Sequence, residues 1–168
     1  TYKLMIAPEL FGPMFWLKEN DFEQVSNIRG VILLKSVGNK RDLRLQKSFS
    51  SNTLLDCASE YAFEQRCGNY ESGEFRSIYG NDETVFEAPP YRIPSITLTR
   101  WPFDQYHTNL DTPEHLDESS LQDTVRISLE ICNVLEKNVV YEPVFSGLVC
   151  LSSYGLYKPL PPIKSEKG

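Results

Sequence analysis

The stretch Gly30-Val-Ile-Leu-Leu-Lys-Ser-Val37 is a run of branched apolar residues directly behind a glycine. A short continuous run of this kind is typical of a strand buried in a sheet. Gly38-Asn39-Lys40 then predicts a turn, and Asp42 to Phe49 alternates polar and apolar residues as a strand at a sheet edge does. We therefore expect a hairpin over residues 30–49, which would make the sheet mixed rather than purely parallel.

Strands and helices alternate along the rest of the chain. Further strands are predicted over Tyr2–Ala7, Glu74–Tyr79 and Ser95–Thr99, helices over 11–18, 52–66 and 117–137, and strand-like pieces after Val139. The last helix has the most regular period, which predicts one apolar stripe of Leu121, Val125, Ser128, Leu129, Cys132 and Leu135. This order of elements predicts an α/β fold with three αβα layers and a mixed central sheet. In open α/β sheets the chemistry lies in loops at the strand ends.

Composition excludes several classes of function. The 168 residues include 17 Lys+Arg and 23 Asp+Glu, for a net charge of −6. Such an acidic chain lacks the basic footprint that nucleic-acid binding needs. No apolar run reaches the ~20 residues that span a bilayer, and the N-terminus lacks the apolar stretch of a secretion signal. We therefore expect neither nucleic acid nor membrane as a partner, and a cytoplasmic location. The irregular spacing of the cysteines predicts free thiols, not a zinc finger.

Three of the predicted loops each carry one residue that could bind a metal. Glu9 follows the first strand, Asp82 lies with Glu83 in the loop after Tyr79, and His107 lies in the loop after Thr99. Carboxylates and an imidazole suit zinc, and a further carboxylate could act as general base. Each residue also has an ordinary interpretation. Glu9 would be a solvated side chain or a helix cap, Asp82 a turn former, and His107 a surface residue.

Short motifs in these loops resemble those of zinc-dependent aminopeptidases. They are Gly80-Asn-Asp-Glu-Thr-Val-Phe86, Arg92-Ile-Pro94 and Tyr106-His-Thr-Asn-Leu-Asp-Thr-Pro-Glu-His-Leu-Asp117. The resemblance is closest to the bacterial aminopeptidase-like proteins of unknown function. Three further motifs match that branch in order, namely Pro8-Glu-Leu-Phe-Gly12, Asn52-Thr53 and Gly155-Leu-Tyr157. The similarity thus extends from residue 2 to about residue 157.

The resemblance implies an architecture and a set of roles. It implies a zinc exopeptidase-like fold of which residues 1–157 form the C-terminal portion, with 158–168 as a flexible tail. Asp82 and His107 would bind one or two zinc ions. Glu9 would be either the general base or a ligand, Arg100 and Tyr106 would contact the substrate, and Asp111 would orient His107. The family also has a His and an Asp ligand earlier in the chain, and neither is found here. We therefore expect a fragment that is inactive alone, or a descendant that has lost its metal.

The implied activity is a metal-dependent hydrolase that cleaves a peptide or amide bond of a peptide or aminoacyl substrate with metal-activated water. The alternative is a catalytically inactive aminopeptidase-like module that binds a small ligand or another protein. Nine Tyr, nine Phe and two Trp residues could serve such an interface, including one that forms a homo-oligomer, although aromatic residues of this kind also fill cores.

Overall fold

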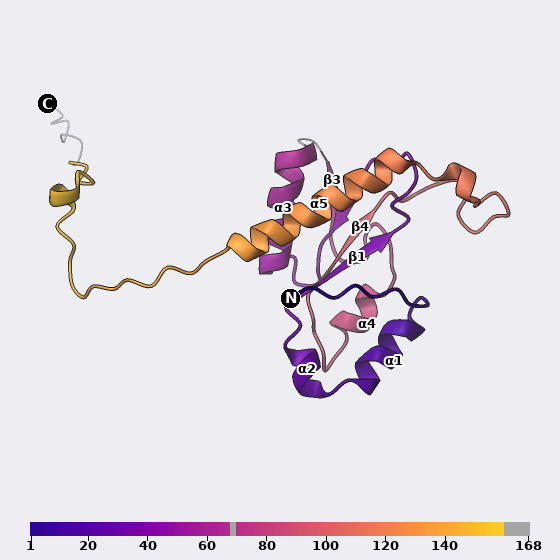
Figure 1. Cartoon of the computed structure of the whole chain (residues 1–168), viewed down its shortest axis with the longest axis horizontal. Coiled ribbons are helices and arrows are strands. Elements are labelled where there is room, and N and C mark those ends of the chain that lie inside the picture. The colour runs from indigo at the N-terminus through magenta and orange to yellow at the C-terminus, as the bar shows by residue number, and fades with distance from the viewer. Residues whose placement is uncertain (68–69, 160–168) are drawn as a thin grey trace, which may run out of the picture. The chain divides into compact units, whose positions relative to one another are not determined.

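The computed structural model describes residues 1–67 and 70–159. The chain divides into two units, Thr1–Asn138 and Val139–Gly168, which are described separately. The first unit holds a four-stranded sheet with helices on both faces (Figure 1). The predicted α/β fold with three αβα layers and a mixed sheet is therefore confirmed.

The sheet has the strand order β1-β4-β2-β3. Its strands are β1 (Val31–Lys35), β2 (Arg44–Gln46), β3 (Glu71–Gly73) and β4 (Ser95–Thr99). β1 runs parallel to β4, β2 runs parallel to β3, and β2 and β4 are antiparallel. The predicted hairpin over residues 30–49 is wrong, because β4 lies between β1 and β2. All five residues of β4 are buried, so this strand takes the interior position that is covered on both faces.

Two other predicted strands are also wrong. Tyr2–Ala7 is exposed and pairs with no strand of the described residues. The strand predicted over Glu74–Tyr79 is replaced by a turn that follows β3, in which the Ser77 N–H donates to the Glu74 carbonyl over 3.0 Å. Gly73 permits this turn, because a Cβ at this position would lie 2.4 Å from Ser77 Oγ.

Helices α3 (Leu54–Cys67) and α5 (Glu118–Lys137) pack together on one face of the sheet (Figure 1). Both were predicted within a few residues. The core here is made by Leu43, Leu45, Leu55, Ala58, Ala62, Phe63, Ile96, Leu98, Ile127 and Ile131. The apolar stripe predicted for the last helix is confirmed only at its end, where Leu135 packs against the core. The buried residues of α5 are Ser120, Thr124, Ile127 and Ile131, whereas Leu121, Val125 and Leu129 are 38 to 59% exposed. Ser120 and Thr124 tolerate burial because their neighbours satisfy them, and the Thr124 hydroxyl donates to the Ser120 carbonyl.

Three short helices form a second core on the other side. They are α1 (Phe11–Glu19), α2 (Phe22–Ser26) and α4 (Glu83–Glu87). Their core residues are Leu17, Val25, Phe86 and Ile93, with Val31 of β1 packed against them. The helix predicted over 11–18 is confirmed, whereas α2 and α4 were not predicted. Five residues give too short a pattern to show a helical period.

The second unit contains little regular structure among its described residues, 139–159. A 3₁₀ turn, η2 (Leu151–Tyr154), ends at Gly155, whose φ of 66° is the left-handed conformation that glycine adopts readily. The strand-like pieces predicted after Val139 are not found in this range. Most of the tail predicted over 158–168 lies outside the described residues. Within the described part of the chain, no helix is both long and apolar enough to cross a membrane.

Candidate functional site

The first two ligand-bearing loops meet through a hydrogen bond. The Leu10 N–H donates to Asp82 Oδ1 over 2.6 Å, although the two residues are 72 positions apart in sequence. Asp82 lies directly before α4, and Leu10 directly precedes α1. The bond therefore brings Glu9 and Asp82 to the same end of the sheet, as the sequence predicted.

Lys35 links the first loop to the third. It is the last residue of β1, and its Nζ lies 3.0 Å from Glu9 Oε2. The same ammonium lies 5.5 Å from the ring centroid of Tyr79 and 6.0 Å from that of Tyr106. Cations at this distance are attracted to aromatic faces. Sequence analysis missed Lys35, although a charged residue at the carboxyl end of a buried strand is a signal that could have identified it.

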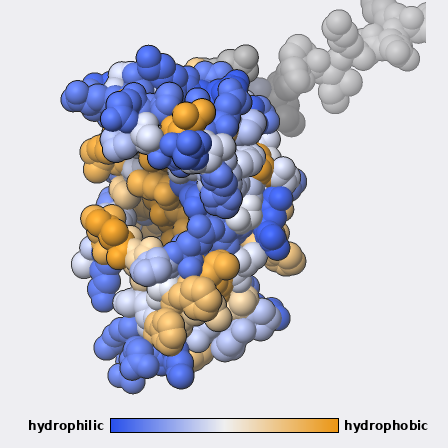
Figure 2. All heavy atoms as spheres, turned by 90° about the vertical axis from the view of Figure 1, so that its right-hand side faces the viewer, coloured by the Kyte–Doolittle hydropathy of each residue, from blue (hydrophilic) through white to orange (hydrophobic). Residues whose placement is uncertain are grey.

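Aromatic rings surround this ammonium. The hydroxyls of Tyr79 and Tyr106 are hydrogen-bonded to each other, and Trp101 packs edge-on to Tyr106 with ring centroids 4.7 Å apart. His107 is stacked on Tyr106 at 3.9 Å, with its side chain in the exposed loop. Burial and the hydroxyl pair raise the pKa of Tyr79, so it stays neutral. Figure 2 views the molecule from the side toward which β1 runs, where apolar side chains gather around a hollow.

Three of the six non-glycine residues with a positive φ among the described residues lie at this place. Leu10, Ser36 and His107 have φ values of 59°, 54° and 57°. Two of these residues directly follow Glu9 and Lys35, and the third is itself a predicted ligand. Residues other than glycine rarely adopt this left-handed backbone region, and those that do occur preferentially at functional sites. The strain therefore marks the loops of Glu9 and His107 and the end of β1 independently of any motif.

Buried polar side chains hold the loop around Tyr79 and Asn81 by hydrogen bonds to its backbone. Gln46 Oε1 accepts hydrogen bonds from the N–H groups of Ile78 and Tyr79, at 3.0 and 2.9 Å. Glu83 is fully buried, and its two oxygens accept the Asn81 N–H at 2.8 Å. Burial raises the pKa of the Glu83 carboxyl. Gln46 Nε2 has no hydrogen-bond partner among the described residues. Sequence analysis assigned no role to Gln46 and only listed Glu83, because nothing in a sequence shows that a polar side chain is buried.

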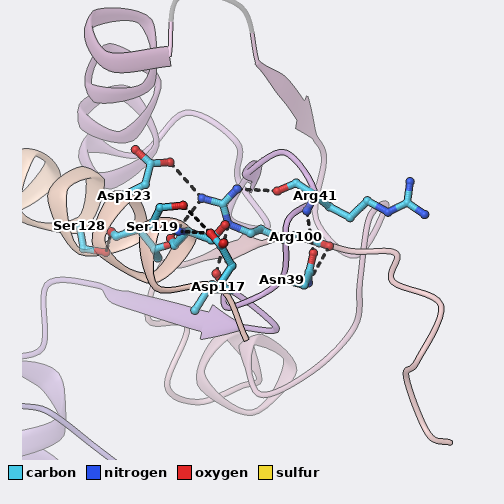
Figure 3. Close-up of polar contacts among 10 residues, drawn as sticks. Asn39, Arg41, Arg100, Asp117, Ser119, Asp123 and Ser128 are labelled. Carbon is cyan, nitrogen blue, oxygen red and sulfur yellow. Dashed lines mark hydrogen bonds and ion pairs between the residues drawn. The ribbon is translucent and has the colours of Figure 1, made fainter. Parts of the chain in front are cut away.

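Arg100 is hydrogen-bonded between the loop after β1 and α5 (Figure 3). Its guanidinium is 7% exposed and donates to the carbonyls of Val37, Arg41 and Ser120 and to Asp123 Oδ2, the last over 3.0 Å. These bonds join the loop after β1 to α5. These contacts give Arg100 a structural role, and its predicted contact with substrate stays a prediction.

The remaining predicted residues are those that sequence analysis expects to bind a metal. Glu9, Asp82 and His107 have the donor chemistry of zinc ligands. Among the described residues, however, no three His, Cys, Asp or Glu side chains come together closely enough to hold a metal ion. Glu9 is paired with Lys35 and Asp82 with the Leu10 N–H. The Asp111 carboxylate makes no hydrogen bond to His107 in the described part of the chain, so the contacts give no support to its predicted orienting role.

Sequence comparison places the first unit of the chain in a family. The domain family of unknown function DUF4910 matches residues 1–138. The chain belongs to DUF4910. This DUF4910 chain is 27% identical over 144 residues to a Clostridium acetobutylicum protein whose name describes polysaccharide biosynthesis and an aminopeptidase-like domain. The match covers 84% of this chain and 32% of that protein.

Solved structures share the fold of the DUF4910 chain. A Clostridium acetobutylicum protein whose name describes a peptidase has a TM-score of 0.71 at 27% identity, with 79% of this chain and 31% of that chain covered. An aminopeptidase from Aneurinibacillus sp. strain AM-1 has a TM-score of 0.62 at 20% identity, and covers 81% of this chain and 33% of its own. A zinc aminopeptidase from Bacillus subtilis has a TM-score of 0.61 at 17% identity, with 74% and 32% covered. The DUF4910 chain thus spans about a third of each relative, which fits the C-terminal part of an aminopeptidase-like domain.

Proposed function

We propose that this chain is part of an aminopeptidase-type hydrolase, which cleaves a peptide or amide bond with metal-activated water. The observation that carries the proposal is the convergence of three loops at one end of the sheet. The Leu10–Asp82 hydrogen bond joins two of them, and Lys35 joins Glu9 to the aromatic cluster of the third. The likeness of the fold to that of known aminopeptidases supports the same interpretation.

In this proposal Asp82 and His107 contribute ligands to zinc, and Glu9 is a ligand or the general base. Zinc in such a site would lower the pKa of its bound water and polarise the scissile carbonyl. A His and an Asp from outside this chain would complete the ligand set, so the 168 residues alone would be inactive. Whether one or two ions bind depends on those residues.

The chain's own residues then shape the substrate site. Tyr106 holds His107 by stacking, and its hydroxyl is fixed by Tyr79. The ammonium of Lys35 offsets the negative charge of Glu9. Tyr106 would contact a peptide or aminoacyl substrate beside these groups, with its aromatic neighbours excluding water.

Metal content tests this proposal directly. Zinc is measured by elemental analysis after dialysis against trace zinc, on this chain and on the full product of its gene. We expect zinc near stoichiometry in the full product and its loss in Asp82→Ala and His107→Ala. His115→Ala is the matched control, because His115 lies in the exposed 3₁₀ turn η1 (Pro113–His115) and should leave the zinc content unchanged. Hydrolysis of aminoacyl amides is the next assay.

A second candidate function is a metal-free binding module. It is favoured by the pairing of Glu9 with Lys35, which places an ammonium beside a carboxylate that the hydrolase would use. The aromatic cluster would then bind a small amine or a sugar by its ring faces. Absence of zinc from both the chain and the full gene product would support this candidate and contradict the hydrolase.

A further inference from the structure

Arg76 has a guanidinium that is held in place and yet donates no hydrogen bond within the described part of the chain. Its Nε lies 4.0 Å from Glu83 Oε1, and its side chain is 56% exposed whereas that of Glu83 is 1% exposed. Both Glu83 oxygens already accept the Asn81 N–H at 2.8 Å. An ion pair with an exposed partner at this distance is weak, so the donor groups of Arg76 are available to a ligand.

Gly80 places this guanidinium beside the candidate site. A Cβ at position 80 would lie 2.9 Å from both Nε and Nη2 of Arg76, so the guanidinium lies against the Gly80 backbone and any side chain there would displace it. Gly80 directly follows Tyr79, whose ring lies near Lys35, and it precedes Asp82 by two residues. Arg76 is therefore held against the segment that joins the aromatic rings to a predicted zinc ligand.

The acidic residues near Arg76 in the sequence have other partners. Asp82 accepts a backbone N–H over 2.6 Å, and Glu74 pairs with Lys47 over 2.9 Å. Among the described residues, Glu83 alone lies within ion-pair distance of Arg76. The exposed side of the guanidinium is thus open to an anion from solution.

We propose that Arg76 binds a carboxylate of the substrate, which would make acidic peptides or acidic aminoacyl compounds the preferred substrates. This inference rests on the hydrolase proposed above and names its substrate class. A guanidinium presents a planar fork of N–H donors that matches a carboxylate, and two parallel hydrogen bonds give both affinity and orientation. A peptide offers a carboxylate at its C-terminus and on Asp or Glu side chains. Arg76 thus offers the chemistry that sequence analysis expected of Arg100, with donor groups that the described residues do not use.

Selectivity between matched substrates tests the proposal on the full product of the gene. Glutamyl and glutaminyl p-nitroanilides test a side-chain carboxylate, and dialanine and its C-terminal amide test a terminal one. We expect the ratio of kcat/KM for the acidic over the neutral member of one pair to fall about tenfold in Arg76→Met, mainly through KM, and to fall less in Arg76→Lys, which keeps the charge but not the fork. Arg126→Met, at an exposed arginine on α5, is the matched control and should leave both ratios unchanged. Unchanged ratios for both pairs in Arg76→Met would overturn the proposal.

Direct binding separates this inference from the proposed hydrolase. The Nε–H resonance of Arg76 in the isotope-labelled full product is identified by its loss in Arg76→Met and is followed by NMR during titration with glutarate at constant ionic strength. We expect a saturable shift with glutarate and none with the neutral glutaramide. A shift without hydrolysis of any substrate would contradict the hydrolase and leave the carboxylate site standing. No shift with glutarate would overturn the proposal, whatever the hydrolysis assays show.

Discussion

Lys35 Nζ lies 3.0 Å from Glu9 Oε2, so the carboxylate proposed for catalysis already has a cation beside it. A metal ion and this ammonium would compete for the same oxygen. The Lys35 side chain is 22% exposed and that of Glu9 48% exposed, and such partly exposed pairs contribute up to about 1 kcal/mol. A variant of Lys35 is thus the change that can show whether Glu9 binds a metal ion.

Replacing Lys35 by Met should strengthen zinc binding if Glu9 is a ligand. We expect the dissociation constant of zinc for the full gene product to fall about two- to fivefold, the size of a partly exposed ion pair. Competition with a chromogenic chelator measures the change. Lys35→Arg keeps the positive charge and should leave the affinity near that of the natural protein. An unchanged affinity in Lys35→Met would exclude Glu9 as a ligand.

Removing the Asp56 carboxylate should destabilise the first unit. Asp56 is fully buried at the start of α3, where it accepts hydrogen bonds from the backbone N–H groups and hydroxyls of Ser48 and Thr53. Asp56→Ala leaves these donors unpaired, so we expect a loss of about 2–4 kcal/mol in the free energy of unfolding. Denaturant titration measures it. Asp21→Ala is the control, since the exposed Asp21 precedes α2 without a side-chain cap and should change stability by under about 0.5 kcal/mol.

Arg100 should matter for stability and not for ligand binding. Arg100→Met removes the bonds from the loop after β1 to α5 and leaves the Asp123 carboxylate without its cation, at an expected cost of about 2–3 kcal/mol. Arg41→Met is the matched control, because the Arg41 side chain is 56% exposed and pairs with an exposed Asp104. Thermal unfolding measures both variants. A stable Arg100→Met variant with weakened substrate binding would instead favour the substrate contact predicted from sequence.

Glu83 should make stability fall as pH rises. Burial raises the pKa of this carboxyl above its usual 4.5, so the folded chain retains the proton at a higher pH than the unfolded chain does. The stabilisation is present below pH 4.5 and is lost as pH rises through the folded-state pKa. Glu83→Gln cannot ionise and should show a flatter curve, with its stability relative to the natural chain increasing toward neutral pH. Urea unfolding between pH 4 and 8 measures both proteins, and parallel curves would contradict the assignment.

Asp117 should have the opposite effect to Glu83 and should make stability fall as pH falls. Its carboxylate accepts hydrogen bonds from the Ser119 hydroxyl and the Ser120 N–H at the start of α5, and these lower its pKa to about 2. The stabilisation is therefore complete above the unfolded value of 3.8 and is lost as pH falls through about 2. Asp117→Ala should be less stable at neutral pH, and the difference should disappear in acid. Circular dichroism at 222 nm follows α5 through this range, and a difference that persists at pH 2 would refute the assignment.

Local sequence signals predicted the elements better than their partners. The strand at residues 95–99 and the helices at 54–67 and 118–137 follow from period, β-branching and a capping aspartate. The mixed sheet was predicted from a hairpin over residues 30–49 that the structure does not contain, and it arises instead from the antiparallel pairing of β2 with β4. The pairing of β1 with β4 could not be predicted, because strand neighbours are set by burial and not by order in the chain. The buried face of α5 was mispredicted because Leu121, Val125 and Leu129 have the spacing of a core stripe. The residues of α5 that are buried are instead two isoleucines and two residues with hydroxyl groups.

The sequence predicted where the residues of the candidate site lie better than it predicted which residues they contact. The sequence located the loops that carry Glu9, Asp82 and His107, and the structure joins the first two of these loops at the Leu10–Asp82 bond. Lys35 and Gln46 were missed because their contacts depend on the strand neighbours that sequence did not provide. The ligand roles of Glu9, Asp82 and His107 stay predictions.

Gln46 makes the sheet register matter for chemistry. Gln46 lies in β2, opposite Thr97 of β4. Its side-chain oxygen accepts hydrogen bonds from the backbone N–H groups of Ile78 and Tyr79. Shifting β2 by one residue would turn this side chain to the opposite face and leave the two amides without an acceptor. The ring centroid of Trp101 lies 4.9 Å from that of Tyr79. A variant that misaligns β2 should therefore change the fluorescence of Trp101 well before the chain unfolds.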